Sequence, residues 1–215
     1  MSLLERIYGL YERVSPSYYA LLRKALKGCK RVVEFGCGDH SPLARQGVEK
    51  TMGVDIHGPS LELARDRKTH DIFVQADVRK FRLKRKFDCA IALDVIEHLP
   101  KKDGKILLEN MEYSARRVVV FTPNGFLEQD QSLVEENPYQ AHLSGWTVDD
   151  FRRFGYKVYG VNGLKCLRGS RAIIRWRPKI FWFAISEISQ WVVFLFPRLA
   201  FQLLAVKDVK PSKRV

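Results

Sequence analysis

The sequence predicts an α/β fold: a doubly wound, mostly parallel sheet with helices on both faces and an apolar helical insert near the C-terminus. Short apolar runs alternate with amphipathic stretches along most of the chain, which is typical of parallel strands connected by helices. Two closely spaced glycines follow the first apolar run, where such a sheet needs a tight turn. At 215 residues, 46% of them hydrophobic, the chain is long enough for one well-buried domain and short for two.

The expected elements alternate in the order that a doubly wound sheet requires. Strands are expected at residues 31–35, 51–55, 72–75, 87–93, 117–121, 156–161 and 200–206, and helices at 60–67, 101–113 and 148–154, with a further helix starting at 42–47. A loop-like stretch with proline and glycine turn signals follows the fifth of these strands. The sequence thus places most of its turns and loops after strands.

Three segments are expected along the chain. Residues 1–28 form a helical cap, in which Pro16 separates two helices because proline breaks a helix interior but is tolerated in a first turn. The main domain covers residues 29–206 and contains the apolar insert at about 176–197. Residues 207–215 form a basic tail. We expect the cap to cover the ligand site.

The cysteines and the N-terminus indicate a reducing compartment. Cys29, Cys37, Cys89 and Cys166 have no C-x-x-C spacing and are expected to be free thiols. No metal site is expected. Charged residues interrupt the apolar run at the N-terminus, which a signal peptide would keep uninterrupted. The protein is therefore expected in the cytoplasm, either free or in peripheral contact with a membrane.

Positive charge is concentrated at the C-terminal end. The net charge is +13, and residues 151–215 hold 14 Lys and Arg against 2 Asp and Glu. Such an excess is typical of a surface that faces phospholipid, a phosphorylated metabolite or nucleic acid. A basic, solvated surface without any partner is the alternative.

The glycine turn after the first strand is built for close contact with a ligand. Gly36 and Gly38 permit the turn and let a ligand approach the backbone. A dinucleotide fingerprint, G-x-G-x-x-G, would need a third glycine where the chain has Ser41. Glu34, just before the turn, would repel a pyrophosphate but would suit a cationic amino-acid group. Both residues argue against an NAD-dependent reductase.

Two further carboxylates follow the next two strands. Asp55 ends the second strand, where a carboxylate can accept hydrogen bonds from both hydroxyls of a ribose. Asp77 follows the third strand, where it could accept from an adenine amine while Val78 or Phe73 packs against the ring. Three carboxylates at three successive strand ends form a more specific signal than any one of them.

These motifs resemble those of the class I S-adenosylmethionine-dependent methyltransferases, in particular the small-molecule branch called type 11. The resemblance covers about residues 30–160 and rests on E-x-G-x-G, the two later aspartates and the run FDCAIALDVIEHLP. It implies a Rossmann-like, seven-strand sheet, S-adenosylmethionine as cofactor and S-adenosylhomocysteine as product. By this resemblance the cofactor contacts Glu34, Gly36, Cys37, Gly38, Asp55, Ile56, Asp77, Val78, Leu93 and Asp94, and Glu97 and His98 begin the helix after the fourth strand. His40 stands where many members have a third glycine.

Two histidines are candidates for a general base. His98 follows the fourth strand and His142 follows the fifth, both on the ligand side of the sheet by topology, and a histidine near neutral pKa could accept a proton from the acceptor. A role for His98 in packing or helix capping is the alternative. His142 lies just before a sequence that resembles an ordinary capping box, T-x-x-D, and both roles can hold at once.

Three residues are candidates for substrate contact. Asn124, Tyr139 and Trp146 lie in the stretch after the fifth strand and combine aromatic walls with hydrogen-bonding groups, as small-molecule pockets do. For Asn124 the alternative is a plain P-N-G turn.

The C-terminal apolar stretch has three explanations. Within residues 175–204, the run 180–196 has Glu187 as its charged residue and is shorter than the about 20 residues that a membrane span needs. It could pack on the protein's own core, contact a membrane surface or a lipid substrate, or form a homodimer through 176–204. All three explanations are compatible with the basic residues on either side of the run.

The predicted function is methyl transfer from S-adenosylmethionine to a small-molecule or lipid-like acceptor. A nucleic-acid methyltransferase is an alternative, but the chain lacks an N-P-P-[YF] tetrapeptide after the fourth strand, so nucleic acid is not expected as a partner. A non-catalytic module that binds the cofactor is another alternative, because a fold does not fix a function. The acceptor atom is left open.

Overall fold

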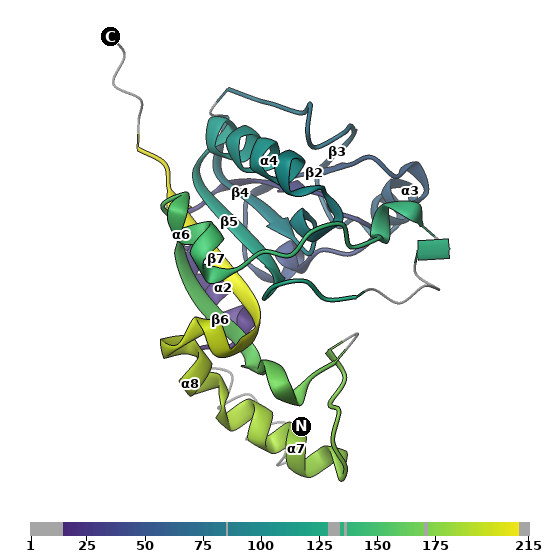
Figure 1. Ribbon diagram of the computed structural model, residues 1–215. Helices are drawn as coiled ribbons and strands as arrows, with labels where there is room; N and C mark the ends of the chain where they lie inside the picture. The colour runs from purple at the N-terminus through teal and green to yellow at the C-terminus, as the bar shows by residue number, and fades with distance from the viewer. Residues whose placement is uncertain (1–14, 85, 129–133, 136, 170–171, 211–215) are drawn as a thin grey trace.

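A seven-stranded mixed sheet forms the centre of the protein (Figure 1). The computed structural model describes residues 15–84, 86–128, 134–135, 137–169 and 172–210. The strands are β1 Arg31–Phe35, β2 Lys50–Asp55, β3 Ile72–Gln75, β4 Phe87–Leu93, β5 Ala115–Pro123, β6 Lys157–Leu164 and β7 Ala200–Asp208. Their order is β3-β2-β1-β4-β5-β7-β6, and β7 runs antiparallel to both of its neighbours. This arrangement confirms the predicted doubly wound, mostly parallel sheet.

Helices cover both faces of the sheet. They are α2 Tyr18–Leu26, α3 Gly58–Asp66, α4 Lys101–Ser114, α6 Val148–Arg153, α7 Lys179–Ile188 and α8 Gln190–Leu195. The loops contain short 3₁₀ turns: η1 Pro42–Arg45, η2 Ile96–His98, η3 Pro138–Gln140, η4 Lys165–Leu167 and η6 Pro197–Leu199. Alternate residues of each strand face opposite sides, so Val33 packs in the core under α4 and α6, whereas Val32 packs under α2. The sheet is therefore buried on both faces, as its apolar strands require.

The helix starts follow local capping rules. Ser17 caps α2 by accepting a hydrogen bond from the Ala20 backbone N–H at 3.3 Å, directly after Pro16. Thr147 and Asp150 form the predicted capping box at the start of α6, with hydrogen bonds of 3.3 and 2.9 Å between each side chain and the other residue's backbone N–H. The helix predicted before Pro16 lies outside the described residues.

The first connection of the sheet differs from the prediction. Instead of a helix from residue 42, the chain makes the single 3₁₀ turn η1. Gly47 then adopts a left-handed conformation, with a φ of +66°, which ends the turn, and β2 begins at Lys50. At the other end, β7 extends to Asp208, two residues into the segment predicted as a basic tail. The cause is pairing with β5, where Asp208 lies opposite Arg117.

Helices α7 and α8 lie in the chain between β6 and β7. Figure 1 shows α8 beside β6 and α7 extending away from the sheet. Helix α8 approaches β6 closely, because a Cβ on Gly160 would stand 2.2 Å from the Val193 carbonyl oxygen, and the rings of Tyr159 and Phe194 stack at 5.6 Å. Within the described residues, no helix is long and apolar enough to cross a membrane.

Candidate active site

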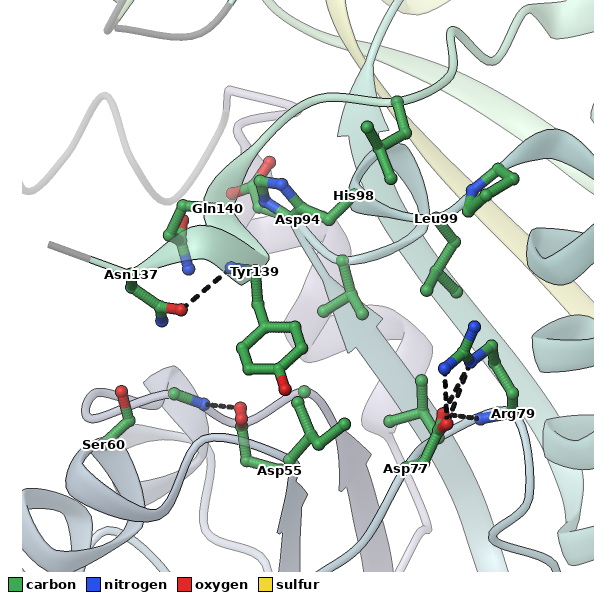
Figure 2. A pocket seen from close by; sticks show the side chains of 17 residues that line it. Asp55, Ser60, Asp77, Arg79, Asp94, His98, Leu99, Asn137, Tyr139 and Gln140 are labelled. Atoms are coloured by element: carbon green, nitrogen blue, oxygen red, sulfur yellow. Dashed lines mark hydrogen bonds and ion pairs between the residues drawn. The ribbon is translucent and has the colours of Figure 1, made fainter. Parts of the chain in front are cut away.

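A cavity of about 340 Å³ opens at the carboxyl ends of β1, β2, β3 and β4. It lies where the strand order reverses, since β1 continues to β2 on one side and β4 lies on the other. In open α/β sheets this is the place where ligands bind. Figure 2 shows the side chains that point into it from these strand ends and from η3.

The glycine turn forms one wall of the cavity. Gly36 and Gly38 have φ values of +70° and +54°, which favour glycine. A Cβ on Gly36 would lie 2.5 Å from a methyl carbon of Val95, so no larger residue fits without movement. The backbone N–H groups of Gly36 and Cys37 both donate to the Val54 carbonyl, at 2.7 and 3.1 Å. The side chain of Cys37 is buried rather than part of the wall, and burial raises the pKa of its thiol.

Asp55 stands at the end of β2 and holds the turn in place. Its two carboxylate oxygens accept hydrogen bonds from the backbone N–H groups of Gly38 and His57, both at 2.8 Å. Because each carboxylate oxygen has a second lone pair, Asp55 can still accept from a ligand. Ile56 lines the cavity beside it.

Asp77 lies after β3 and is paired with an arginine that the sequence did not single out. Arg79 Nε and Nη2 lie 2.9 and 2.7 Å from the two Asp77 oxygens, and Arg79 Nη1 lies 3.0 Å from Asp103. The Arg79 hydrogen bonds lower the pKa of Asp77. Val78 and Arg79 line the cavity, whereas Phe73 packs edge-on against the His70 ring. Val78 therefore lies where it could pack against a base in the cavity, and Phe73 does not.

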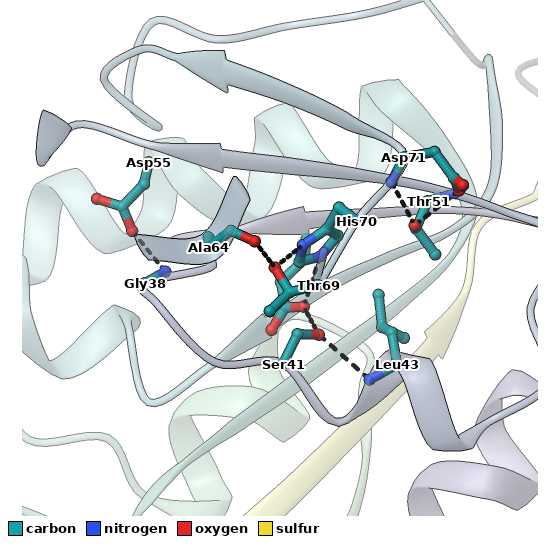
Figure 3. A network of polar contacts seen from close by, with 10 residues as sticks. Gly38, Ser41, Leu43, Thr51, Asp55, Ala64, Thr69, His70 and Asp71 are labelled. Atoms are coloured by element: carbon teal, nitrogen blue, oxygen red, sulfur yellow. Dashed lines mark hydrogen bonds and ion pairs between the residues drawn. The ribbon is translucent and has the colours of Figure 1, made fainter. Parts of the chain in front are cut away.

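Glu34 lies beneath the glycine turn and not in the cavity wall. Its Oε2 accepts from Ser41 Oγ at 2.5 Å and lies 3.0 Å from His70 Nε2. Figure 3 shows Ser41 and His70 within this network. Both Glu34 and His70 are buried. The predicted contact with a cationic amino-acid group is therefore replaced by a polar network that supports the turn. No sequence signal marked His70 as the partner, because it lies in the loop before β3.

The end of β4 contributes acidic groups. Leu93 packs against the core under α2 and is not in the cavity wall. Asp94 lines the cavity with a left-handed backbone, φ +53°, and its N–H donates to the Phe121 carbonyl at 2.9 Å. The Asp94 carboxyl group faces the cavity, but the surrounding protein removes much of its contact with water. This desolvation raises the pKa of Asp94 to about 7. Glu97 and His98 do not begin a helix: they form the turn η2, and α4 starts at Lys101.

The two candidate histidines meet. The ring centroids of His98 and His142 are 4.8 Å apart. Burial lowers the pKa of His98 to about 4, and burial also lowers the pKa of His142. Both rings are therefore neutral near pH 7, and His98 is a weak base. His98 lines the cavity, and His142 lies behind it.

The three proposed substrate residues have different positions. The Tyr139 ring reaches into the cavity between Asp55 and Asp77 (Figure 2). Asn124 is buried, and its amide donates to carbonyls just before and at the start of β7, including that of Ala200 at 2.9 Å. Trp146 is fully buried among core aromatic residues. Asn124 and Trp146 therefore stabilise the fold and do not line the cavity, because their polar groups are directed to protein partners.

Comparisons with known proteins agree with this geometry. Residues 33–117 match the family model described as a methyltransferase domain. No curated protein matches the chain. Among solved structures, the methyltransferase domain of bacterial CtHen1-C is 18% identical, with 89% of this chain and 96% of that chain covered and a TM-score of 0.56. A SAM-dependent methyltransferase from Archaeoglobus fulgidus is 18% identical over 93% of this chain and 98% of its own, with a TM-score of 0.52.

The structural likeness concerns the fold, and the family match covers the turn, the two aspartates and β4. The cavity also fits S-adenosylmethionine: Gly36 and Gly38 lack Cβ atoms and so allow close approach, and Asp55 offers free lone pairs at the end of β2. The chain therefore has the class I methyltransferase fold, and its residues 33–117 match a methyltransferase domain.

Proposed function

We propose that the chain transfers the methyl group of S-adenosylmethionine to a lipid-like small molecule. The observation that carries this proposal is the lining of the cavity, in which two chemically distinct groups of residues face each other (Figure 2). One end is formed by the glycine turn, Asp55 and Asp77, and the other by Asp94, His98 and Leu143. The first end suits the cofactor and the second an acceptor with a polar reacting group and an apolar body.

Specific residues would hold the cofactor. Asp55 would accept from the ribose hydroxyls, Val78 would pack against the adenine, and Asp77 would accept from its amine. Tyr139 would cover the ligand, since its ring lies between the two aspartates. The glycine turn would approach the methionyl part most closely.

The cofactor supplies an activated methyl group, so the chain has to align the acceptor and exclude water. His98, with a pKa of about 4, can accept a hydrogen bond from an acceptor hydroxyl or amine and so orient it. Asp94, with a pKa raised to about 7, can take up the acceptor's proton as it is released.

The surface formed by α7, α8 and η6 supports a lipid-like acceptor. Large apolar side chains are exposed there: Trp176, Ile180, Phe181, Phe183, Ile188, Trp191, Leu195, Phe196 and Leu199. Ile180 is 82% exposed and Leu195 is 70% exposed. Basic residues border this apolar–basic face at Arg175, Arg177, Lys179 and Arg198. Exposed aromatic and aliphatic side chains next to cations are typical of proteins that bind anionic membranes peripherally.

The apolar–basic face lies at the same edge of the sheet as the cavity. The strand β7 begins at this edge, where Gln202 pairs with Pro123 at the carboxyl end of β5. The Gln202 amide also lies 3.4 Å from Asp94 in the cavity. An acceptor anchored in a membrane under α7 and α8 would thus meet the acceptor end of the cavity.

Methyl transfer from tritiated S-adenosylmethionine into cell extracts tests the proposed acceptor class. We expect the label in the lipid fraction, in amounts that depend on the enzyme. Label confined to RNA would contradict the proposal and support a nucleic-acid methyltransferase. Tight binding of S-adenosylhomocysteine without label in the lipid, aqueous or RNA fraction would contradict it in favour of a binding module.

Co-flotation with vesicles tests the membrane contact separately. At low salt the chain is expected to float with phosphatidylcholine vesicles that contain phosphatidylglycerol, and the double variant Ile180→Asp, Leu195→Asp is expected to stay at the bottom, because charge on the apolar face opposes insertion. Leu63→Asp is the matched control, since Leu63 is an exposed leucine on α3. Wild-type protein that does not float with these vesicles would exclude the membrane contact.

A further inference from the structure

Two cysteines meet at the amino ends of β1 and β4, at the edge of the sheet opposite the active-site cavity. Cys29 lies in the loop before β1, and Cys89 is the third residue of β4. The backbone N–H groups of Lys30 and Arg31 both donate to the Asp88 carboxylate at 2.9 Å, which holds this loop beside the start of β4. Both cysteines are free thiols, and the Cys89 thiol donates a hydrogen bond to the Cys29 sulfur.

The two thiols differ in exposure and in acidity. Cys29 is half-buried, whereas Cys89 is fully buried. Arg117 pairs with Cys89 across β4 and β5, and its guanidinium donates to the Ala25 carbonyl at 2.8 Å and lies close to the Cys29 sulfur. The hydrogen bond from Cys89 and the charge of Arg117 lower the pKa of Cys29 to about 7, although burial opposes them. Burial raises the pKa of Cys89. Near pH 7 the outer sulfur is therefore partly a thiolate, the nucleophilic form, and the inner one is a thiol.

Cys29 opens onto a second cavity, which has a cationic lining. This cavity has a volume of about 580 Å³ and lies between α2 and Gln46. Among the residues that the structure describes, no carboxylate lines it. Three cationic side chains from the last turn and C-cap of α2 do: Arg23, Lys24 and Lys27. Positive charge around a cysteine stabilises its thiolate and attracts an anionic reagent. A small disulfide that carries carboxylates, such as glutathione disulfide, matches this chemistry.

We propose that Cys29 and Cys89 form a reversible redox pair that exchanges with anionic low-molecular-weight disulfides in the cationic cavity. The Cys29 thiolate attacks one sulfur of the reagent, whose S–S bond breaks, and the thiolate that leaves takes up the proton that Cys29 had lost. The Cys89 sulfur then loses its proton and attacks the Cys29 sulfur. This step forms the Cys29–Cys89 bond and expels the second thiolate, which takes up that proton. The two cysteines are oxidised, and the reagent is reduced to two thiols.

Mass spectrometry of the intact chain after incubation with glutathione disulfide tests the redox pair. The test needs neither cofactor nor acceptor, so its outcome is independent of the proposed function. Cys166 is exposed and can react by itself, so the Cys166→Ser variant is the starting protein. We expect this protein to lose two hydrogens, and peptide mapping to locate the new bond between Cys29 and Cys89. Dithiothreitol is expected to restore the original mass.

Two further variants of the Cys166→Ser protein separate the roles of the cysteines. Adding Cys89→Ala is expected to stop the reaction at the mixed disulfide, so that the chain gains one glutathione at Cys29. Adding Cys29→Ala is expected to abolish both products, because Cys89 is buried. Peptide mapping of the starting protein carries the test if Cys89→Ala does not fold. A starting protein that forms no Cys29–Cys89 bond, or a Cys29→Ala variant that reacts equally well, would overturn the inference.

The charge of the reagent has a test of its own, in which the cationic disulfide cystamine is compared with glutathione disulfide at low salt. The double variant Lys24→Gln, Lys27→Gln is expected to lower the ratio of the glutathione disulfide rate to the cystamine rate by at least about fivefold. The matched control is Lys102→Gln, Lys105→Gln, two exposed lysines of α4, which is expected to leave the ratio unchanged. An unchanged ratio in the first variant would overturn the assignment of an anionic reagent.

Discussion

Replacing Asp55 with alanine is expected to weaken the binding of S-adenosylhomocysteine by at least about 100-fold. The change removes the acceptor of two ribose hydrogen bonds, and a hydrogen bond to a charged group contributes about 1.5–3 kcal/mol. It also frees the backbone N–H groups of Gly38 and His57, which Asp55 now holds at 2.8 Å. Calorimetric titration of the variant measures the loss.

Two controls separate the ribose contact from other effects. Asp55→Asn keeps one oxygen acceptor and is expected to fall between the wild type and Asp55→Ala. Asp66→Ala removes an exposed aspartate at the end of α3 and is expected to bind like the wild type. An affinity for Asp55→Ala within threefold of the wild type would show that the cofactor ribose lies elsewhere.

Gly160→Ala is expected to lower the free energy of unfolding by about 2–3 kcal/mol. The new Cβ would stand 2.2 Å from the Val193 carbonyl oxygen and 2.7 Å from the Ala200 Cβ, so α8 would have to move away from β6. Overpacking of this kind typically costs about 1–3 kcal/mol, and here the obstacle is backbone rather than a side-chain tip. Urea denaturation followed by circular dichroism measures the change.

Gly58→Ala is the matched control for this prediction. Gly58 lies in the first turn of α3, where an added Cβ meets the end of the flexible Gln75 side chain at 3.2 Å. Alanine is also the better helix former, so this variant is expected to be as stable as the wild type or slightly more stable. Equal stability of the Gly58 and Gly160 variants would mean that α8 does not pack on β6 as described.

Strand positions could be predicted well because the strands are buried on both faces. Residues 31–35 and 87–93 match β1 and β4, since short apolar runs bounded by polar residues leave little choice of strand position. The predicted helix from residue 42 was wrong, because Gly47 ends the turn before a helix can form. Hydrophobic periodicity does not reveal the left-handed backbone conformation of Gly47.

Site residues on strand ends were easier to predict than their orientations. Asp55 and Asp77 follow their strands directly, and topology alone brings both to the cavity. Glu34 is also next to the glycine turn, but its side chain points beneath it toward His70. Leu93 likewise faces the core, one residue before Asp94. Alternation along a strand assigns two faces but does not say which one meets the ligand.

Contacts between distant segments could not be predicted from the sequence. His98 and His142 were each predicted to lie on the ligand side, and nothing in their spacing showed that their rings would meet. Backbone hydrogen bonds between Glu97 and the segment after His142 bring them together. Such bonds depend on the folded path of the chain between β5 and α6. The proximity of the two rings was therefore visible only in the structure.

A crystal structure of the chain with S-adenosylhomocysteine tests the central claim most directly. The account predicts that the ribose hydroxyls contact Asp55, that the adenine lies at Val78 and Asp77, and that the sulfur faces Asp94 and His98. A ligand bound outside this cavity, or one with its sulfur turned away from Asp94 and His98, would contradict the assignment of the cofactor and acceptor ends.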